Sequence, residues 1–145
     1  MAAEFPKLSN QSREVLSTAE REVRRFNHSH IGTEHVLLAL VQVTDGLAVR
    51  VLGSMNVEPD DVRAAIEPTI VRGERPFLDD FHLTPHVKEM VEFAVDEARR
   101  SGCFLIGTEH LLMGITRGDG VAAGVLESLG VSLDMVRAEA KRLSE

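Results

Sequence analysis

Two carboxylates and two imidazoles recur at one spacing in this chain, and they are the side chains best suited to chemistry. The pentapeptide Ile-Gly-Thr-Glu-His occurs at residues 31–35 and again at 106–110. In each copy the glutamate, Glu34 or Glu109, lies in the expected first turn of an apolar helix. A carboxylate there is suited to receive a cation from a partner, best a guanidinium in bidentate geometry. The alternative interpretation is that each carboxylate only complements the positive end of a helix dipole.

The residues around the pentapeptides also recur, which indicates that the chain is one unit written twice. After each pentapeptide the match continues with a slip of one residue. We therefore predict two repeats, at about residues 8–71 and about residues 83–145, joined by a linker at about residues 72–82 that contains glycine, proline and aspartate. The matching pairs include Leu8/Leu83, Glu22/Glu97, Gly46/Gly120 and Leu52/Leu126.

Each repeat is expected to fold as four helices, so the predicted fold class is all-α. The chain then holds eight helices and no strands, in two four-helix repeats related by a pseudo-twofold axis. Ser9 and Thr84 are the expected N-caps of the first helices. Thr33 and Thr108 are the expected N-caps of the second helices, whose apolar residues on all sides predict a buried position. Pro68 is expected to break the fourth helix of the first repeat.

Composition excludes several classes of function. The formal net charge of -7 argues against binding nucleic acid through its phosphates. No stretch approaches the roughly 20 apolar residues that a membrane-spanning helix needs. Cys103 is the only cysteine, so no internal disulfide can form, which favours a reducing compartment. We expect a soluble, cytoplasmic domain that is monomeric in isolation.

Metal binding and catalysis find little support in the sequence. His28, His30 and His35 are close enough to be tested as zinc ligands, but Cys103 and Leu105 replace two of them in the second repeat. There is no nucleophile elbow and no phosphate-binding loop. Cys103 is expected to be a half-buried structural residue. We therefore expect no metal, no cofactor and no enzymatic activity. The alternative class is a small-molecule or metal-dependent enzyme with its site in the cleft between the repeats.

The motifs together resemble a known family. The double Ile-Gly-Thr-Glu-His, each followed by an apolar helix and by Asp-Gly-x-Ala-x-x-Val-Leu, is similar to the amino-terminal domain of Clp/Hsp100 unfoldases of the ClpC type. The resemblance runs from about Leu8 to Leu143. It implies a noncatalytic docking domain of the Clp protease system that binds adaptors, substrates or degradation tags. The ATPase modules of that family are absent from these residues, so the chain is either a fragment of an unfoldase or a freestanding protein made only of this domain. Its divergence from the usual ClpC pattern favours the freestanding protein, which would compete with the unfoldase's own domain.

The resemblance also implies a ligand. Some ClpC-type domains recognise proteins phosphorylated on arginine, and the glutamate of each pentapeptide contacts the guanidinium. The phosphate is expected near the starts of the first helices. Gln11 and His86 stand where the ClpC pattern usually has arginine, which predicts weaker phosphoarginine binding than in typical relatives. The expected ligand-binding residues are Glu34, Glu109, Thr33, Thr108, Ser9, Thr84, Lys7, Arg13 and Lys88.

The lack of a phosphate-binding loop leads to a first prediction. The chain should neither bind nor hydrolyse ATP, because no glycine-rich loop followed by lysine is present to hold the phosphates. Isothermal titration calorimetry with Mg-ATP should show no saturable heat, and no phosphate should be released. A micromolar dissociation constant for ATP would contradict this expectation.

Overall fold

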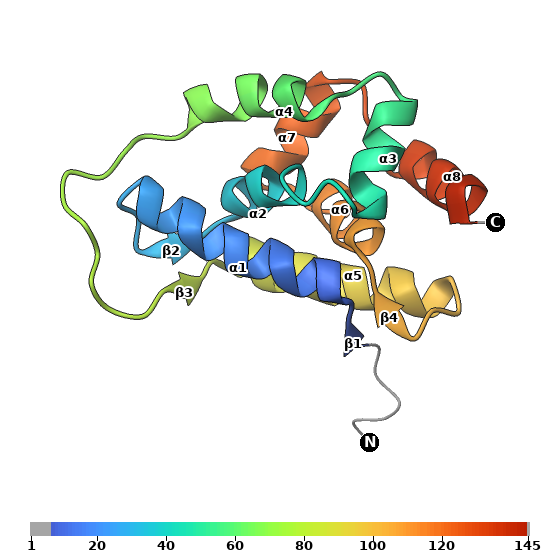
Figure 1. The fold of residues 1–145 in the computed structure, drawn as a ribbon, viewed down its shortest axis with the longest axis horizontal. Helices are drawn as coiled ribbons and strands as arrows, with labels where there is room; N and C mark the ends of the chain where they lie inside the picture. Colours follow the sequence, from blue (N-terminus) through green and yellow to red (C-terminus); the bar gives the residue numbers. More distant parts are fainter. Residues whose placement is uncertain (1–6, 145) are drawn as a thin grey trace.

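The computed structural model describes residues 7–144, and α-helices dominate this part of the chain (Figure 1). The all-α class and the expected eight helices are confirmed there. No helix within residues 7–144 is both long and apolar enough to cross a lipid bilayer. The helices are α1 (Asn10–Arg25), α2 (Thr33–Leu40), α3 (Leu47–Ser54), α4 (Pro59–Ile66), α5 (Pro85–Arg100), α6 (Thr108–Arg117), α7 (Val121–Ser128) and α8 (Leu133–Ser144).

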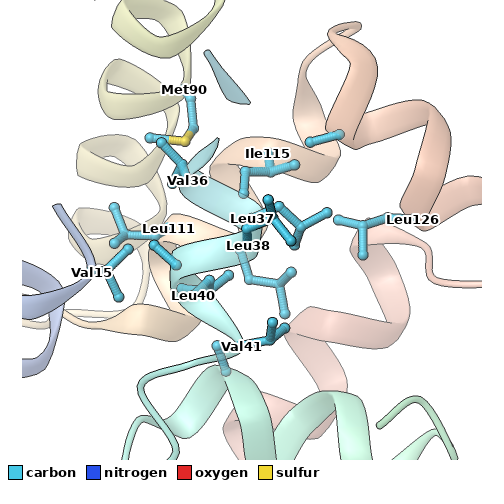
Figure 2. Packing of buried hydrophobic residues seen from close by; sticks show 14 of the residues in the cluster. Val15, Val36, Leu37, Leu38, Leu40, Val41, Met90, Leu111, Ile115 and Leu126 are labelled. Atoms are coloured by element: carbon cyan, nitrogen blue, oxygen red, sulfur yellow. The ribbon is translucent and has the colours of Figure 1, made fainter. Parts of the chain in front are cut away.

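Helices α2 and α6 form the centre of the molecule. In Figure 1 they lie between α1 and α5 on one side and α3, α4, α7 and α8 on the other. Every residue of α2 except Glu34 is buried, as its apolar composition predicts. Figure 2 shows the side chains of α2 packed among others from α5, α6 and α7. The central side chains are Val36, Leu37, Leu38, Leu40, Met90, Leu111, Ile115 and Leu126.

The ends of the first helices follow local sequence rules. The Ser9 hydroxyl accepts a hydrogen bond from the backbone N–H of Ser12, and the Thr84 hydroxyl accepts one from Val87. Both residues are therefore the N-caps that the sequence predicts. Pro68 also acts as expected, because α4 ends just before it in a 3₁₀-helix at Glu67–Thr69.

The expectation of no strands was wrong in detail. In the described part of the chain, four strands of two residues pair in parallel across the two repeats. The strand β1 (Lys7–Leu8) pairs with β4 (Leu105–Ile106), and β2 (His30–Ile31) pairs with β3 (His82–Leu83). Such short strands show no alternation of polar and apolar residues, so they form only where the fold lays two segments side by side. Each pair joins one repeat to the other.

The expectation that Thr33 and Thr108 are N-caps was also wrong. The N-caps of α2 and α6 are Gly32 and Gly107, and each threonine is the first helical residue. An N-cap hydroxyl normally bonds to a backbone N–H two or three residues further along its own helix. Both threonine side chains are buried instead against the opposite repeat, where their hydroxyls serve another helix.

The two threonine hydroxyls cap helices of the opposite repeat. The N–H of Ala48, at the start of α3, donates to Thr108 Oγ1 over 2.9 Å. Reciprocally, the N–H of Ala122, at the start of α7, donates to Thr33 Oγ1 over 3.4 Å. A Cβ on Gly46 would lie 2.7 Å from the Thr108 hydroxyl, so the glycine before α3 permits this close approach. These reciprocal bonds match a pseudo-twofold relation between the repeats.

The boundaries of the repeats stay a prediction. Residues 70–81 form neither helix nor strand, and they overlap the expected linker. This segment is held against the first repeat, because the N–H of Gly73 donates to the carbonyl of Phe26 and the Asn27 amide donates to the carbonyl of Gly73.

The crossed caps, in which Thr108 and Thr33 accept from helix starts of the opposite repeat, lead to a stability prediction. Thr108→Val should lower the free energy of unfolding by about 1–3 kcal/mol, because it leaves the buried N–H of Ala48 without an acceptor. Thr33→Val should cost less, since its hydrogen bond is longer. Thr116→Val is the control, because that hydroxyl only donates to Met113 within its own helix. Urea unfolding measures all three, and equal losses for Thr108→Val and Thr116→Val would contradict the crossed cap.

Candidate ligand-binding sites

Glu109 lies in a pocket of about 540 Å³ to which both repeats contribute. The start of α6 supplies Glu109, and the start of α1 supplies Ser9 and Gln11. The parallel pair β1–β4 brings these two helix starts together. Asp45 adds a second carboxylate to the lining, and the exposed ring of Phe104 adds an apolar surface. The pocket is therefore acidic on one side and apolar on another.

Glu34 lies in the corresponding pocket, which measures about 340 Å³. Here α2 supplies Glu34, the segment before it supplies His28 and His30, and Thr84 comes from the start of α5. The pair β2–β3 joins these segments. The structure thus brings Glu34 together with Thr84, and Glu109 together with Ser9. Each glutamate meets the first-helix cap of the opposite repeat.

The glycine of each pentapeptide makes room for its glutamate. The Glu34 carboxylate folds back over Gly32, and a Cβ on that glycine would overlap the carboxylate. Glu109 folds over Gly107 in the same way. Both glutamates are half-buried. Within residues 7–144 neither carboxylate accepts a hydrogen bond or forms an ion pair. Both are therefore available to a cation from a ligand.

The remaining predicted ligand residues are arranged less favourably. Lys7, Arg13 and Lys88 are exposed, and they line neither pocket. Neither lining contains a lysine or arginine among the described residues. Thr108 lines the larger pocket but its hydroxyl is occupied by α3, and Thr33 lies buried outside the smaller one. A role for these five residues in ligand binding stays a prediction.

The histidine of the first pentapeptide belongs to a hydrogen-bonded chain that sequence reasoning missed. The N–H of Gly32 donates to His35 Nδ1 over 2.9 Å, so the neutral ring carries its proton on Nε2. That nitrogen lies 2.8 Å from His28 Nδ1, and His28 Nε2 lies 2.6 Å from the carbonyl oxygen of Val71. Burial lowers the pKa of His35 to about 4, although the nearby Glu34 carboxylate acts in the opposite direction. The two rings tie the segment after α4 to the start of α2.

The second repeat keeps only part of this chain. The N–H of Gly107 donates to His110 Nδ1 over 2.9 Å, and burial lowers the pKa of His110. Cys103 stands at the place of His28, but it is exposed, so the expectation of a half-buried residue was wrong. The reason is that the short turn after α5 places its side chains at the surface, as the exposure of Phe104 also shows.

One group of side chains has the spacing of metal ligands within residues 7–144. His86, Glu89 and Asp119 offer ligand atoms that lie within 4.8 Å of one another, and His86 Nδ1 is 3.3 Å from Asp119 Oδ1. All three residues are exposed. Because exposed acidic groups often cluster without binding an ion, the arrangement by itself assigns no metal. The histidines tested in the sequence, at residues 28–35, do not belong to this group.

Comparison with known proteins agrees with this architecture. The model of the Clp repeat (R) N-terminal domain matches the chain twice, over residues 7–129 and 82–145. The chain belongs to this family. This Clp N-terminal domain is 40% identical over 140 residues to the chaperone protein ClpB of Oceanobacillus iheyensis. It is 39% identical over 140 residues to the negative regulator of genetic competence ClpC/MecB of Bacillus subtilis. Both alignments cover 96% of this chain but only 17% of the relative.

Solved structures show the same fold. The N-terminal domain of ClpD from Arabidopsis thaliana has a TM-score of 0.73 at 22% identity, over 100% of this chain and 98% of that chain. The Hsp104 N-terminal domain from Candida albicans has a TM-score of 0.79 at 14% identity, over 95% and 91% of the two chains. At these identities the likeness establishes the fold alone. The pentapeptides predicted a resemblance to Clp N-terminal domains, and these comparisons confirm it.

The buried histidine of this Clp domain predicts how its stability depends on pH. In the unfolded chain His35 should titrate near its ordinary pKa of about 6.5, whereas in the folded protein it titrates at about 4. Between these values only the unfolded chain binds the proton. The contribution of His35 to stability is therefore complete above about pH 6.5 and is lost as the pH falls toward about 4.

Urea unfolding at about pH 7.5 and about pH 5 should show a loss of about 2 kcal/mol from His35. The variant His35→Gln should reduce this difference, while His30→Gln, which changes an exposed residue, should preserve it. His110 should add a loss in the same direction, because its pKa is also lowered by burial. Equal pH dependence in the wild type and His35→Gln would show that the ring titrates normally.

Proposed function

We propose that this domain is a noncatalytic docking module of the Clp protease system that binds arginine side chains of adaptor or substrate proteins. The observation that carries the proposal is the pair of half-buried carboxylates, Glu34 and Glu109, which have no cation partner within residues 7–144. Each lies in a pocket made by both repeats. A guanidinium can satisfy such a carboxylate with two parallel hydrogen bonds.

The pocket linings favour a cation over a phosphate. Glu109 and Asp45 give the larger pocket two carboxylates and no lysine or arginine among the described residues. Gln11 supplies a neutral amide where the ClpC pattern has arginine. Arginine in a protein segment should therefore bind with less electrostatic penalty than phosphoarginine. If phosphoarginine binds, its phosphate would lie toward the helix starts at Ser9 and Thr84, and its affinity would be lower than in relatives with the arginine.

The presence of two sites suggests how a partner protein would bind. A protein segment with two arginines at a suitable separation could occupy both pockets, which would strengthen binding through a raised effective concentration. A polypeptide made of this domain alone would compete with the N-terminal domain of a Clp unfoldase for adaptors and arginine-phosphorylated substrates. This competition is part of the proposal; the chain spans only 17% of the length of the relatives ClpB and ClpC/MecB.

Replacing the carboxylates tests the proposal. An arginine-rich peptide and phosphoarginine should each bind the wild type, and Glu34→Gln or Glu109→Gln should weaken binding at its own site by about 1.5–3 kcal/mol, because one charge-assisted pair is lost. The double variant should lose specific binding. Isothermal titration calorimetry measures the affinities and the number of sites.

Glu14→Gln is the matched control, because Glu14 is an exposed glutamate on α1 that lines neither pocket. It should bind as the wild type does. Equal affinities across the wild type, both single variants and the double variant would reduce the glutamates to residues that complement the helix dipole. Adaptor docking at another surface would then have to be sought.

A further inference from the structure

The second repeat contains another pocket, which extends beyond the proposed arginine site. It measures about 550 Å³ and lies between α5, α6 and α8. Its far wall comes from the last turns of α8, which runs to Ser144. The first repeat has no counterpart of that wall, because α4 ends at Ile66, just before Pro68. The pocket therefore exists through a difference between the repeats.

A buried histidine offers an unused hydrogen-bond donor to this pocket. His110 lines it, although the residue is only 2% exposed. Its Nδ1 accepts from Gly107, so its proton lies on Nε2. No group within residues 7–144 accepts from that nitrogen. Since no buried side-chain nitrogen or oxygen lacks a partner there, Nε2 lies at an accessible surface, and His110 lines both this pocket and the pocket of Glu109 described above.

The first repeat shows what normally satisfies this donor. His35 occupies the place of His110, and its Nε2 faces the ring of His28. In the second repeat Cys103 replaces that ring, and Cys103 lines the pocket. The smaller side chain therefore leaves the donor of His110 open to a ligand.

The buried acidic group of the pocket is already neutralised. Glu97 is 2% exposed, and Arg137 donates to both of its oxygens, over 2.8 and 2.6 Å. Arg117 donates to it as well, over 2.8 Å. These arginines hold the pKa of Glu97 below its usual range. Glu97 therefore presents no uncompensated negative charge to a ligand.

The rim of the pocket is basic on the side of α8. The side-chain ammonium of Lys141 has no ion pair or hydrogen bond within residues 7–144. Arg100 pairs with Asp96 through Nε, and its other N–H groups have no acceptor within residues 7–144. Glu109 is the remaining acid, and its carboxylate is folded back over Gly107. A neutral N–H donor at the base and a free ammonium at the rim suit a bound oxyanion.

We propose that the pocket between α5, α6 and α8 binds an oxyanion, a phosphate or carboxylate group of a ligand, through His110 Nε2–H and Lys141. This site shares Glu109 and His110 with the larger arginine pocket, but it goes beyond the docking of arginine, because it uses Lys141, which lines neither arginine pocket, and needs no cation at Glu109. The first repeat cannot form it, since His28 fills the equivalent space and Glu67 stands at the place of Lys141.

Titration with inorganic phosphate tests the site. Calorimetry and the histidine ring resonances in NMR spectra monitor the binding. Phosphate should bind once and shift the His110 signals. Lys141→Gln should weaken binding roughly tenfold or more, because a charge-assisted hydrogen bond is lost. Cys103→His should abolish it, because the new ring should take the Nε2–H of His110 as in the first repeat. His28→Cys is the matched control and should add no second phosphate, since Glu67 replaces Lys141 there.

The outcomes separate the ligand classes. Phosphate binding at least roughly tenfold tighter than acetate binding would assign a phosphorylated ligand, and comparable affinities would assign a carboxylate as well. No saturable binding of either anion would overturn the proposal. So would wild-type phosphate affinity in folded Cys103→His or Lys141→Gln, with folding checked by urea unfolding. Glu109→Gln distinguishes this site from the arginine site, because it should weaken arginine binding at the pocket of Glu109 while leaving phosphate bound.

Discussion

The rest of the structure depends on hydrogen bonds that each repeat supplies to the other. A helix begins with backbone N–H groups that have no partner within the helix, and burying them unpaired is costly. At α3 the missing acceptor is Thr108, and at α7 it is Thr33, each from the opposite repeat. The pentapeptide helices α2 and α6 are thereby held at the centre, where their apolar side chains form the core. Neither repeat could complete its own third helix in the same way alone.

Within the pentapeptide the four residues after isoleucine each have a separate role. Glycine leaves room for the folded-back glutamate, and threonine caps the opposite repeat. Histidine accepts the N–H of the glycine, so it completes its own helix start. Glutamate alone has no partner of this kind within residues 7–144. The motif is thus largely structural, and it leaves one half-buried carboxylate in the lining of each pocket without a hydrogen bond or ion pair within residues 7–144.

The two repeats differ most at two places, the turn that follows the first helix and the end of the fourth helix. In the first, His28 connects His35 to the carbonyl of Val71, and α4 stops before Pro68. In the second, Cys103 replaces the ring, and α8 continues for about one turn beyond the place that corresponds to the end of α4. One exchange removes a hydrogen-bond acceptor, and the other adds a basic wall. Together they give His110 surroundings that differ from those of His35, and this difference does not follow from the symmetry of the repeats.

The sequence by itself determined the duplication, the eight helices, the caps at Ser9 and Thr84 and the break at Pro68, because these depend on periodicity and on contacts within a few residues. It also singled out the two glutamates, whose repetition is visible without a structure. Only the tertiary structure decided that Thr108 serves the opposite repeat, that short strands pair across the repeats, and that Ser9 meets the second glutamate instead of the first. Such contacts join residues far apart in the chain, and no local pattern encodes which distant N–H a hydroxyl will meet.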